Sequence, residues 1–265
     1  MRYRFLLVAL ALMSLPAGAQ TPEGWVAAAE GGCLLWNGAP VTTETVNWSG
    51  DCANGRAQGR GIVEWFEDGK QAGRFDGDYV DGKANGLGLY ISPDGFRYEG
   101  EWSEGVFNGQ GEAKWSDGSR YVGSWRDGKP DGRGSLRDPN GRYDGELREG
   151  RLNGSGVFTW TNGDRYDGQW RDGKMEGTGV FRWRNGDRYE GEFHEDEANG
   201  RGVFAEAGPN NRYEGTWLDG KPNGQGTLRL DSGETFTGLW TKGCFREGTR
   251  QKAFRTPPAA CGFRP

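Results

Sequence analysis

The amino-acid sequence predicts an all-β protein. The expected fold is an elongated, twisted antiparallel single-sheet solenoid of about eight β-hairpin repeats of ~23 residues, with a disulfide-stapled cap at each end. An aromatic residue with glycine two positions later recurs nine times between Trp48 and Phe236, and each of the first eight has further glycines eleven and thirteen residues on. The chain has 49 glycines but also 12 Trp, 9 Tyr and 13 Phe, which is too aromatic for a disordered chain.

The first 19 residues are predicted to be a cleaved signal peptide. Arg2 and Arg4 form a basic head, residues 5–15 form an apolar run too short to span a bilayer, and Ala19 ends a small-residue cleavage site. We therefore expect export to the periplasm, with secretion as the alternative compartment and a retained anchor as the competing interpretation. The formal net charge of −5 argues against nucleic acid as a partner.

Each repeat is predicted to form one β-hairpin. In the repeat that begins at Tyr98, the residues Tyr98, Gly100 and Trp102 alternate with polar residues, which is the period of a strand. A turn is expected at residues 104–105, followed by a second alternating strand and a tight turn at Asp117-Gly118. This much glycine excludes a long helix.

The two faces of the predicted sheet differ in chemistry. One face carries an arginine before seven of the nine aromatics and often an acid after the aromatic, and we expect it to be solvated. On the other face the rings are expected to lie across the glycines of the neighbouring strand. The sequence leaves open whether these rings are mainly the core of a one-layer sheet or also an exposed stripe that binds a partner. The candidate binding face consists of two adjacent rows of rings: Tyr98, Trp102, Tyr121, Trp125, Tyr143, Tyr166, Trp170, Tyr189, Phe193, Tyr213 and Trp217.

The recurring pattern YEGEW…G…NGxG…DGxxYxG closely resembles the MORN repeat family (membrane occupation and recognition nexus) over roughly residues 48–248. The resemblance implies a long twisted sheet of successive hairpins, and a scaffold or an appendage to a catalytic domain. Three departures stand out. Cys52 occupies the tryptophan position of the first repeat, Asp196 replaces a first-turn glycine, and residues 205–211 replace a tight second turn, where we expect an irregular loop.

The four cysteines are predicted to form one disulfide at each end. About 17 strands at ~4.8 Å would make the sheet roughly 80 Å long, so cysteines at opposite ends could not meet. We therefore predict Cys33–Cys52 and Cys244–Cys261, in preference to free reactive or metal-binding thiols. Since solenoid ends need caps, the expected organisation is a signal peptide at 1–19, an N-terminal cap at 20–47, a repeat region at 48–243 and a C-terminal cap at 244–265.

His194 is the only histidine, and it lies among carboxylates, so it is the sharpest candidate for catalysis. It occupies a variable position five residues after Tyr189, and nothing marks a serine or cysteine as its partner. The nearby acids lack the spacing of a calcium loop, one histidine does not make a zinc site, and acids on an open face do not form a glycosidase pair. We therefore expect no enzyme activity and no catalytic, metal-binding or cofactor-binding residues.

The leading functional hypothesis is a non-enzymatic exported scaffold that mediates protein–protein interaction or self-assembly through the aromatic face. The alternative is a membrane-associated module that binds lipid head groups or cell-wall glycan at the envelope, because aromatic rings stack on sugars. The acidic net charge argues against simple electrostatic attraction to lipid.

Overall fold

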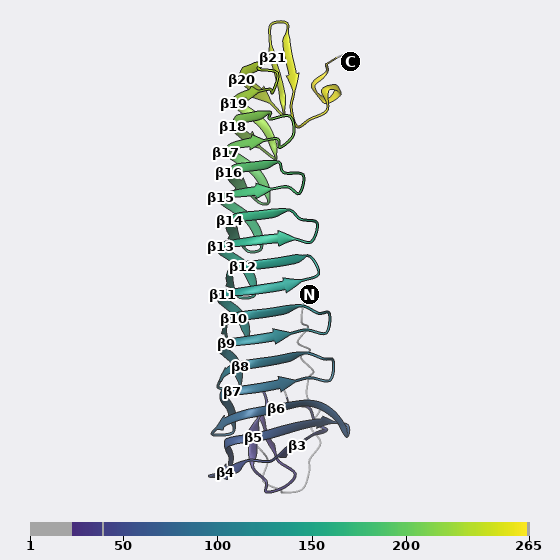
Figure 1. The fold of residues 1–265 in the computed structure, drawn as a ribbon. Coiled ribbons are helices and arrows are strands. Elements are labelled where there is room, and N and C mark those ends of the chain that lie inside the picture. The colour runs from purple at the N-terminus through teal and green to yellow at the C-terminus, as the bar shows by residue number, and fades with distance from the viewer. Residues whose placement is uncertain (1–22, 39, 264–265) are drawn as a thin grey trace.

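The computed structural model describes residues 23–38 and 40–263, and the predicted signal peptide at 1–19 lies outside them (Figure 1). The described chain is all β, apart from the short 3-10 helix η1 (Pro258–Cys261). The N-terminal strands are β1 (Trp25–Ala27), β2 (Leu34–Trp36), β3 (Glu44–Trp48), β4 (Asp51–Ala53), β5 (Arg56–Glu67) and β6 (Lys70–Val80).

The repeats that follow have a regular hairpin pattern. Their strands are β7 (Lys83–Ile91), β8 (Arg97–Ser103), β9 (Val106–Lys114), β10 (Arg120–Arg126), β11 (Lys129–Asp138), β12 (Gly141–Arg148), β13 (Arg151–Trp160), β14 (Arg165–Arg171), β15 (Lys174–Arg182), β16 (Arg188–His194), β17 (Glu197–Ala205), β18 (Arg212–Leu218), β19 (Lys221–Arg229), β20 (Thr235–Thr241), β21 (Cys244–Glu247) and β22 (Arg250–Ala253). As expected, residues 206–211 are irregular.

The strands form one long open sheet. From β5 onwards each strand pairs antiparallel with the next, as in β13–β14 and β21–β22. β3 and β4 both pair with the other edge of β5. The sheet has 22 strands rather than about 17, because short strands at both ends continue it. It is also mixed rather than purely antiparallel, since β2 meets β5 in parallel at Leu34 and Arg56.

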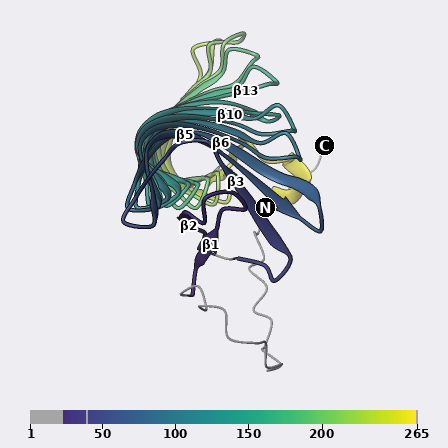
Figure 2. The ribbon, with the colours of Figure 1, turned by 90° about the horizontal axis from the view of Figure 1, so that it is seen from below.

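A β-bulge in each regular hairpin bends the sheet. In β14–β15 the pair Gly168–Gly179 is followed by Gln169–Glu176, so Gly177 and Thr178 have no partner on β14. Gly177 has a φ of 65°, a left-handed conformation that glycine adopts without strain. The freed amide of Thr178 donates to Oε1 of Gln169 at 3.1 Å. Bulges increase twist, and the sheet viewed along its length is curved into a trough (Figure 2). We call the concave side the inner face and the convex side the outer face.

The buried side chains of the inner face form two clusters. The larger runs from Tyr98 to Phe254, and the smaller lies at the N-terminal end, from Ala28 to Ala84. The predicted disulfides are confirmed: Cys33 is bonded to Cys52 at one end, and Cys244 to Cys261 at the other.

Candidate binding face

The tyrosine of each regular repeat lies over a glycine pair. A Cβ atom added to Gly179 would lie 2.4 Å from the hydroxyl oxygen of Tyr166, and one added to Gly168 would lie 2.5 Å from it. The hydroxyl group donates to the backbone carbonyl of Gln169 at 3.0 Å, so the buried phenol is satisfied. Only glycine leaves room for the ring at these positions.

In the repeats that have a tryptophan four residues after the first aromatic, the indole reaches back to the preceding repeat from Trp102 onwards. Nε1 of Trp170 donates to the carbonyl of Gly156 at 3.1 Å. The same bond recurs for Trp102, Trp125, Trp217 and Trp240. This hydrogen bond ties the first strand of one hairpin to the second strand of the hairpin before it.

The rings also form a ladder along the sheet. Tyr166 meets Trp170 of its own repeat edge to face at 5.1 Å, and Phe193 of the next repeat at 5.0 Å. Tyr189 does the same with Phe193 at 5.0 Å and Trp217 at 5.2 Å. Edge-to-face pairs of this kind add about 0.5–1.5 kcal/mol each beyond area burial, so neighbouring repeats stabilise one another.

The eleven residues of the candidate binding face lie together on the inner face, where they form part of the hydrophobic core. All of them except Trp102 are buried, and Trp102 is half-buried. Burial raises the pKa of Tyr121 and Tyr213 to about 12. Whether this set also binds a partner stays a prediction, but little of its surface reaches solvent.

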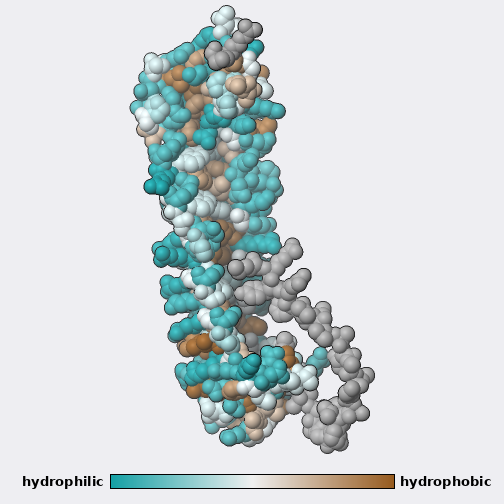
Figure 3. Space-filling model, turned by 90° about the vertical axis from the view of Figure 1, so that its right-hand side faces the viewer, coloured by the Kyte–Doolittle hydropathy of each residue, from teal (hydrophilic) through white to brown (hydrophobic). Residues whose placement is uncertain are grey.

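A second aromatic row, absent from the sequence-based set, is more accessible. We call it the rim row, and it consists of half-buried rings near the second turns: Trp115, Trp160, Phe181 and Trp183. Ring centroids are 5.4 Å apart between Trp160 and Phe181, and 4.6 Å between Phe181 and Trp183. The signal in the sequence is a tryptophan three residues before the turn glycine, as in WSDG, WTNG and WRNG. Viewed from the side of the second turns, hydrophobic patches follow the long axis of the molecule (Figure 3).

The C-terminal segment folds back onto this aromatic surface. The ring of Phe254 stacks on Tyr213 at 6.1 Å and contacts Phe204 at 5.9 Å. The guanidinium of Arg255 lies 4.3 Å from the ring centroid of Phe204 and 5.1 Å from that of Trp183. The inner face and its rim thus accept an aromatic side chain and a cation from a segment that follows the last repeat.

The outer face carries the expected charged ladder. Arg165 pairs with Asp167 at 3.0 Å, and Arg142 with Asp144 at 2.8 Å. Glu112 accepts hydrogen bonds from Arg120 and Lys114, which lower its pKa to about 2. These side chains are largely exposed, so solvent screens each pair and it contributes little to stability.

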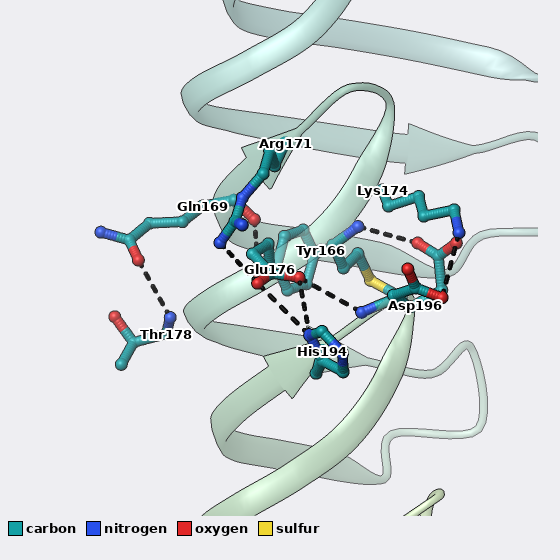
Figure 4. Close-up of polar contacts among 10 residues, drawn as sticks. Tyr166, Gln169, Arg171, Lys174, Glu176, Thr178, His194 and Asp196 are labelled. Carbon is teal, nitrogen blue, oxygen red and sulfur yellow. Dashed lines mark hydrogen bonds and ion pairs between the residues drawn. The ribbon is translucent and has the colours of Figure 1, made fainter.

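His194 lies in a network of surface ion pairs (Figure 4). Its Nδ1 is 3.3 Å from Glu176, which also pairs with Arg171 at 2.6 Å. Desolvation acts to raise the pKa of Glu176, but the Glu195 amide, His194 and Arg171 outweigh it, and the pKa is lowered. The imidazole itself is 64% exposed. An exposed imidazole that pairs with a carboxylate in this way is typical of a solvated, charged turn.

Asp196 replaces the turn glycine without leaving the turn open. It keeps a positive φ of 73°, and its carboxylate accepts the Met175 amide at 2.8 Å while its own amide donates to the Met175 carbonyl at 3.1 Å. The local hydrogen bonds offset part of the strain that a non-glycine residue has there.

The described residues contain neither a metal-binding cluster nor a membrane-spanning helix. In the stretches 23–38 and 40–263, no group of three or more His, Cys, Asp or Glu side chains is placed to hold a metal ion. Within the same residues, no helix has the length and apolar character needed to cross a membrane.

Comparisons with known proteins identify the repeats. The model of the MORN repeat matches seven segments, which together cover more than half of the chain: residues 75–97, 98–120, 121–141, 143–165, 166–188, 189–205 and 213–235. The predicted first repeat at Trp48 is not among them. Curated protein sequences give no significant match. Among solved structures, the chain is similar to the TCP domain of SAS-4 (dCPAP) of Drosophila melanogaster, in complex with a proline-rich motif of Ana2 (dSTIL). The identity is 11%, the TM-score is 0.37, and the match covers 58% of this chain and 84% of that one.

Proposed function

Because the chain belongs to the MORN repeat family, we propose that it is a non-enzymatic scaffold that binds an extended protein segment along the inner face of its sheet. MORN repeats are generally non-catalytic repeats that mediate protein or membrane interaction. The most direct support is the C-terminal segment, which already lies on this face in the way such a partner would. Phe254 stacks on Tyr213, and the guanidinium of Arg255 lies over Trp183 of the rim row.

The rim row is the part of the inner face that we assign to the partner. The rim-row rings Trp160, Phe181 and Trp183 are half-buried, whereas the tyrosines of the ring ladder are fully buried. Aromatic residues are enriched where protein interfaces have their strongest contacts, since a rigid ring buries much area at little entropic cost. Arg255 already uses one ring of this row, Trp183, and an incoming aromatic or basic side chain would find similar rings along the rest of it.

The proposed location is the periplasm, with secretion as the alternative. Two disulfides are typical of a protein that matures in an oxidising compartment. The basic head and apolar run at residues 1–15 support export, followed by cleavage after Ala19. We retain the proposed division into signal, N-terminal cap, repeat region and C-terminal cap.

In-cell photo-crosslinking tests this proposal. A crosslinking amino acid is placed at Trp160 in one strain, and at Thr159 in another. The two positions adjoin in β13, but Thr159 is exposed on the outer face. We expect a discrete protein adduct from position 160 and none from position 159.

The opposite result has a definite meaning. No adduct from position 160, with the protein sedimenting with membranes or wall material, would refute the protein scaffold and support the lipid or glycan alternative. An adduct of twice the chain's mass would identify self-assembly.

A further inference from the structure

A hollow lies at the N-terminal end of the trough, apart from the rim row. It has a volume of about 410 Å³ and is bounded by the N-terminal strands on one side and β5 to β9 on the other. Trp36 of β2 forms one wall: its amide donates to the Gly82 carbonyl at 2.8 Å, and its ring lies so close to Gly105 that an added Cβ would be 2.6 Å away. The disulfide between Cys33, which directly precedes β2, and Cys52 of β4 lies at the same end of the sheet.

The walls of the hollow are aromatic. Trp65, Tyr90 and Trp102 are half-buried here, and their rings meet edge to face, with centroids 6.4 Å apart from Trp65 to Tyr90 and from Tyr90 to Trp102. Phe107 continues the wall, 4.7 Å from Trp102. Several ring faces around one space create a region of negative electrostatic potential.

Two carboxylates line the same hollow. Glu44 of β3 and Glu67 of β5 lie directly opposite each other in the strand register, and both belong to its wall. Like charges in register on neighbouring strands destabilise a sheet unless something offsets them. Glu44 accepts hydrogen bonds from Nδ2 of Asn37 at 2.7 and 3.0 Å, which holds its carboxylate in place. Among the described residues, those that line the hollow include no lysine or arginine.

The surrounding rings already accept cations elsewhere. The ammonium group of Lys83 lies 5.5 Å from the ring centroid of Trp36, and the guanidinium of Arg56 lies 4.6 Å from that of Trp25. Lys83 is engaged by Glu104 at 2.7 Å. Both cations are side chains of the protein itself, and neither Lys83 nor Arg56 forms a recorded ion pair with Glu44 or Glu67 within the described residues.

We propose that this hollow is a binding site for a small quaternary ammonium group of the trimethylammonium type. Such a cation carries a charge that Glu44 and Glu67 offset, and its methyl groups fit the ring faces of Trp65, Tyr90 and Trp102. A primary ammonium or a guanidinium could donate to Glu44 and Glu67, but its remaining N–H donors would face a lining that is otherwise mainly ring and apolar carbon. The methylated cation has no N–H to leave unsatisfied. This inference is independent of the proposed protein scaffold and uses different residues.

Calorimetric titration of the oxidised full chain tests the site. The probes are tetramethylammonium, choline, and 3,3-dimethyl-1-butanol, which is the neutral isostere of choline. We expect saturable binding of both cations, and binding of the isostere at least about tenfold weaker, because the cation–π and carboxylate interactions are lost with the charge.

Matched variants locate the site on the surface. Glu44→Gln keeps the shape of the side chain and removes its charge, and Trp65→Leu removes one ring. Trp160→Leu is the control, since Trp160 holds the same position in its repeat as Trp65. We expect about a tenfold loss of choline affinity for the first two variants and no change for the control, with all three unfolding cooperatively.

Each outcome decides the proposal. Equal binding of choline and the neutral isostere would overturn it, as would unchanged choline affinity in Glu44→Gln and Trp65→Leu. Saturable binding of a lysine-rich or arginine-rich peptide, without binding of tetramethylammonium, would also overturn it, in favour of a basic protein segment. Binding to phosphatidylcholine vesicles but not to vesicles of phosphatidylglycerol would support it and identify a lipid as the source of the group; binding of free choline alone would support a soluble source.

Discussion

Replacing Gly179 by alanine tests whether the buried ring of Tyr166 needs a residue without a Cβ atom on the neighbouring strand. The added Cβ would lie 2.4 Å from the hydroxyl oxygen, 2.5 Å from Cε2 and 2.6 Å from Cζ of Tyr166. The Tyr166 ring cannot easily move away from the added atom, because it is fully buried and packed edge to face against Trp170 and Phe193. Overpacking of this kind costs about 1–3 kcal/mol, and a displaced ring would also weaken the hydrogen bond from Tyr166 to Gln169, worth about 1 kcal/mol. We expect Gly179→Ala to lower the free energy of unfolding by about 2–3 kcal/mol.

The control for this variant is Gly208→Ala. Nothing lies within 4 Å of a Cβ built on Gly208, and its backbone is not in the left-handed region. Urea unfolding of both variants, followed by tryptophan fluorescence, gives the comparison, with the slope on denaturant checked because repeat proteins can unfold in parts. If the two variants differ by less than about 0.5 kcal/mol, the ring does not depend on an empty Cβ position, and the account of the ladder is wrong.

Three further results are expected. Serine at both Cys244 and Cys261 opens a loop with a sequence separation of 17 and should cost about 3 kcal/mol in urea unfolding under oxidising conditions, and the difference from the wild type should disappear when both proteins are reduced. The buried phenols of Tyr121 and Tyr213, with pKa raised to about 12, stabilise the fold fully below the unfolded pKa of ~10, and this stability is lost as the pH rises through 12. Phenolate absorbance and unfolding should then rise together, and ionisation of both in the folded chain near pH 10 would contradict the assignment. His194→Ala should change the free energy of unfolding by less than about 0.5 kcal/mol, and a larger loss would show that the ion-pair network with Glu176 matters to folding.

Much of the repeat region can be predicted from the sequence because its constraints are local. The period of about 23 residues, the alternation within each strand and the turn dipeptides specify hairpins and their register. The disulfide pairing follows from the length of such a sheet. The two glycines of each pair, however, have different roles that spacing does not separate. Gly177 adopts a left-handed conformation in the bulge, whereas Gly179 makes room for the ring of Tyr166.

The remaining features depend on contacts far apart in the sequence. The curvature of the trough accumulates from one bulge per hairpin. Within this curved sheet the tyrosine ladder is buried and the rim row is half-exposed. The return of Phe254 and Arg255 onto Phe204 and Tyr213 has no periodic signal, since these residues follow the last repeat. The hollow at the other end likewise requires Trp36 to cross from a short N-terminal strand to the turn at Gly105.

The division of the inner face into two rows explains how one repeat can serve both stability and recognition. The tyrosine and tryptophan of the first strand are tied to backbone carbonyls and to rings of the adjacent repeats, so a substitution there disturbs the fold before it disturbs binding. The rim row contributes less to this network and keeps part of each ring at the surface, so its residues can vary to suit a partner. A variant such as Trp160→Leu should therefore change what the protein binds while leaving the ladder beneath it intact. The candidate binding residues that sequence periodicity makes most visible are therefore also core residues, and a role for them in binding stays a prediction.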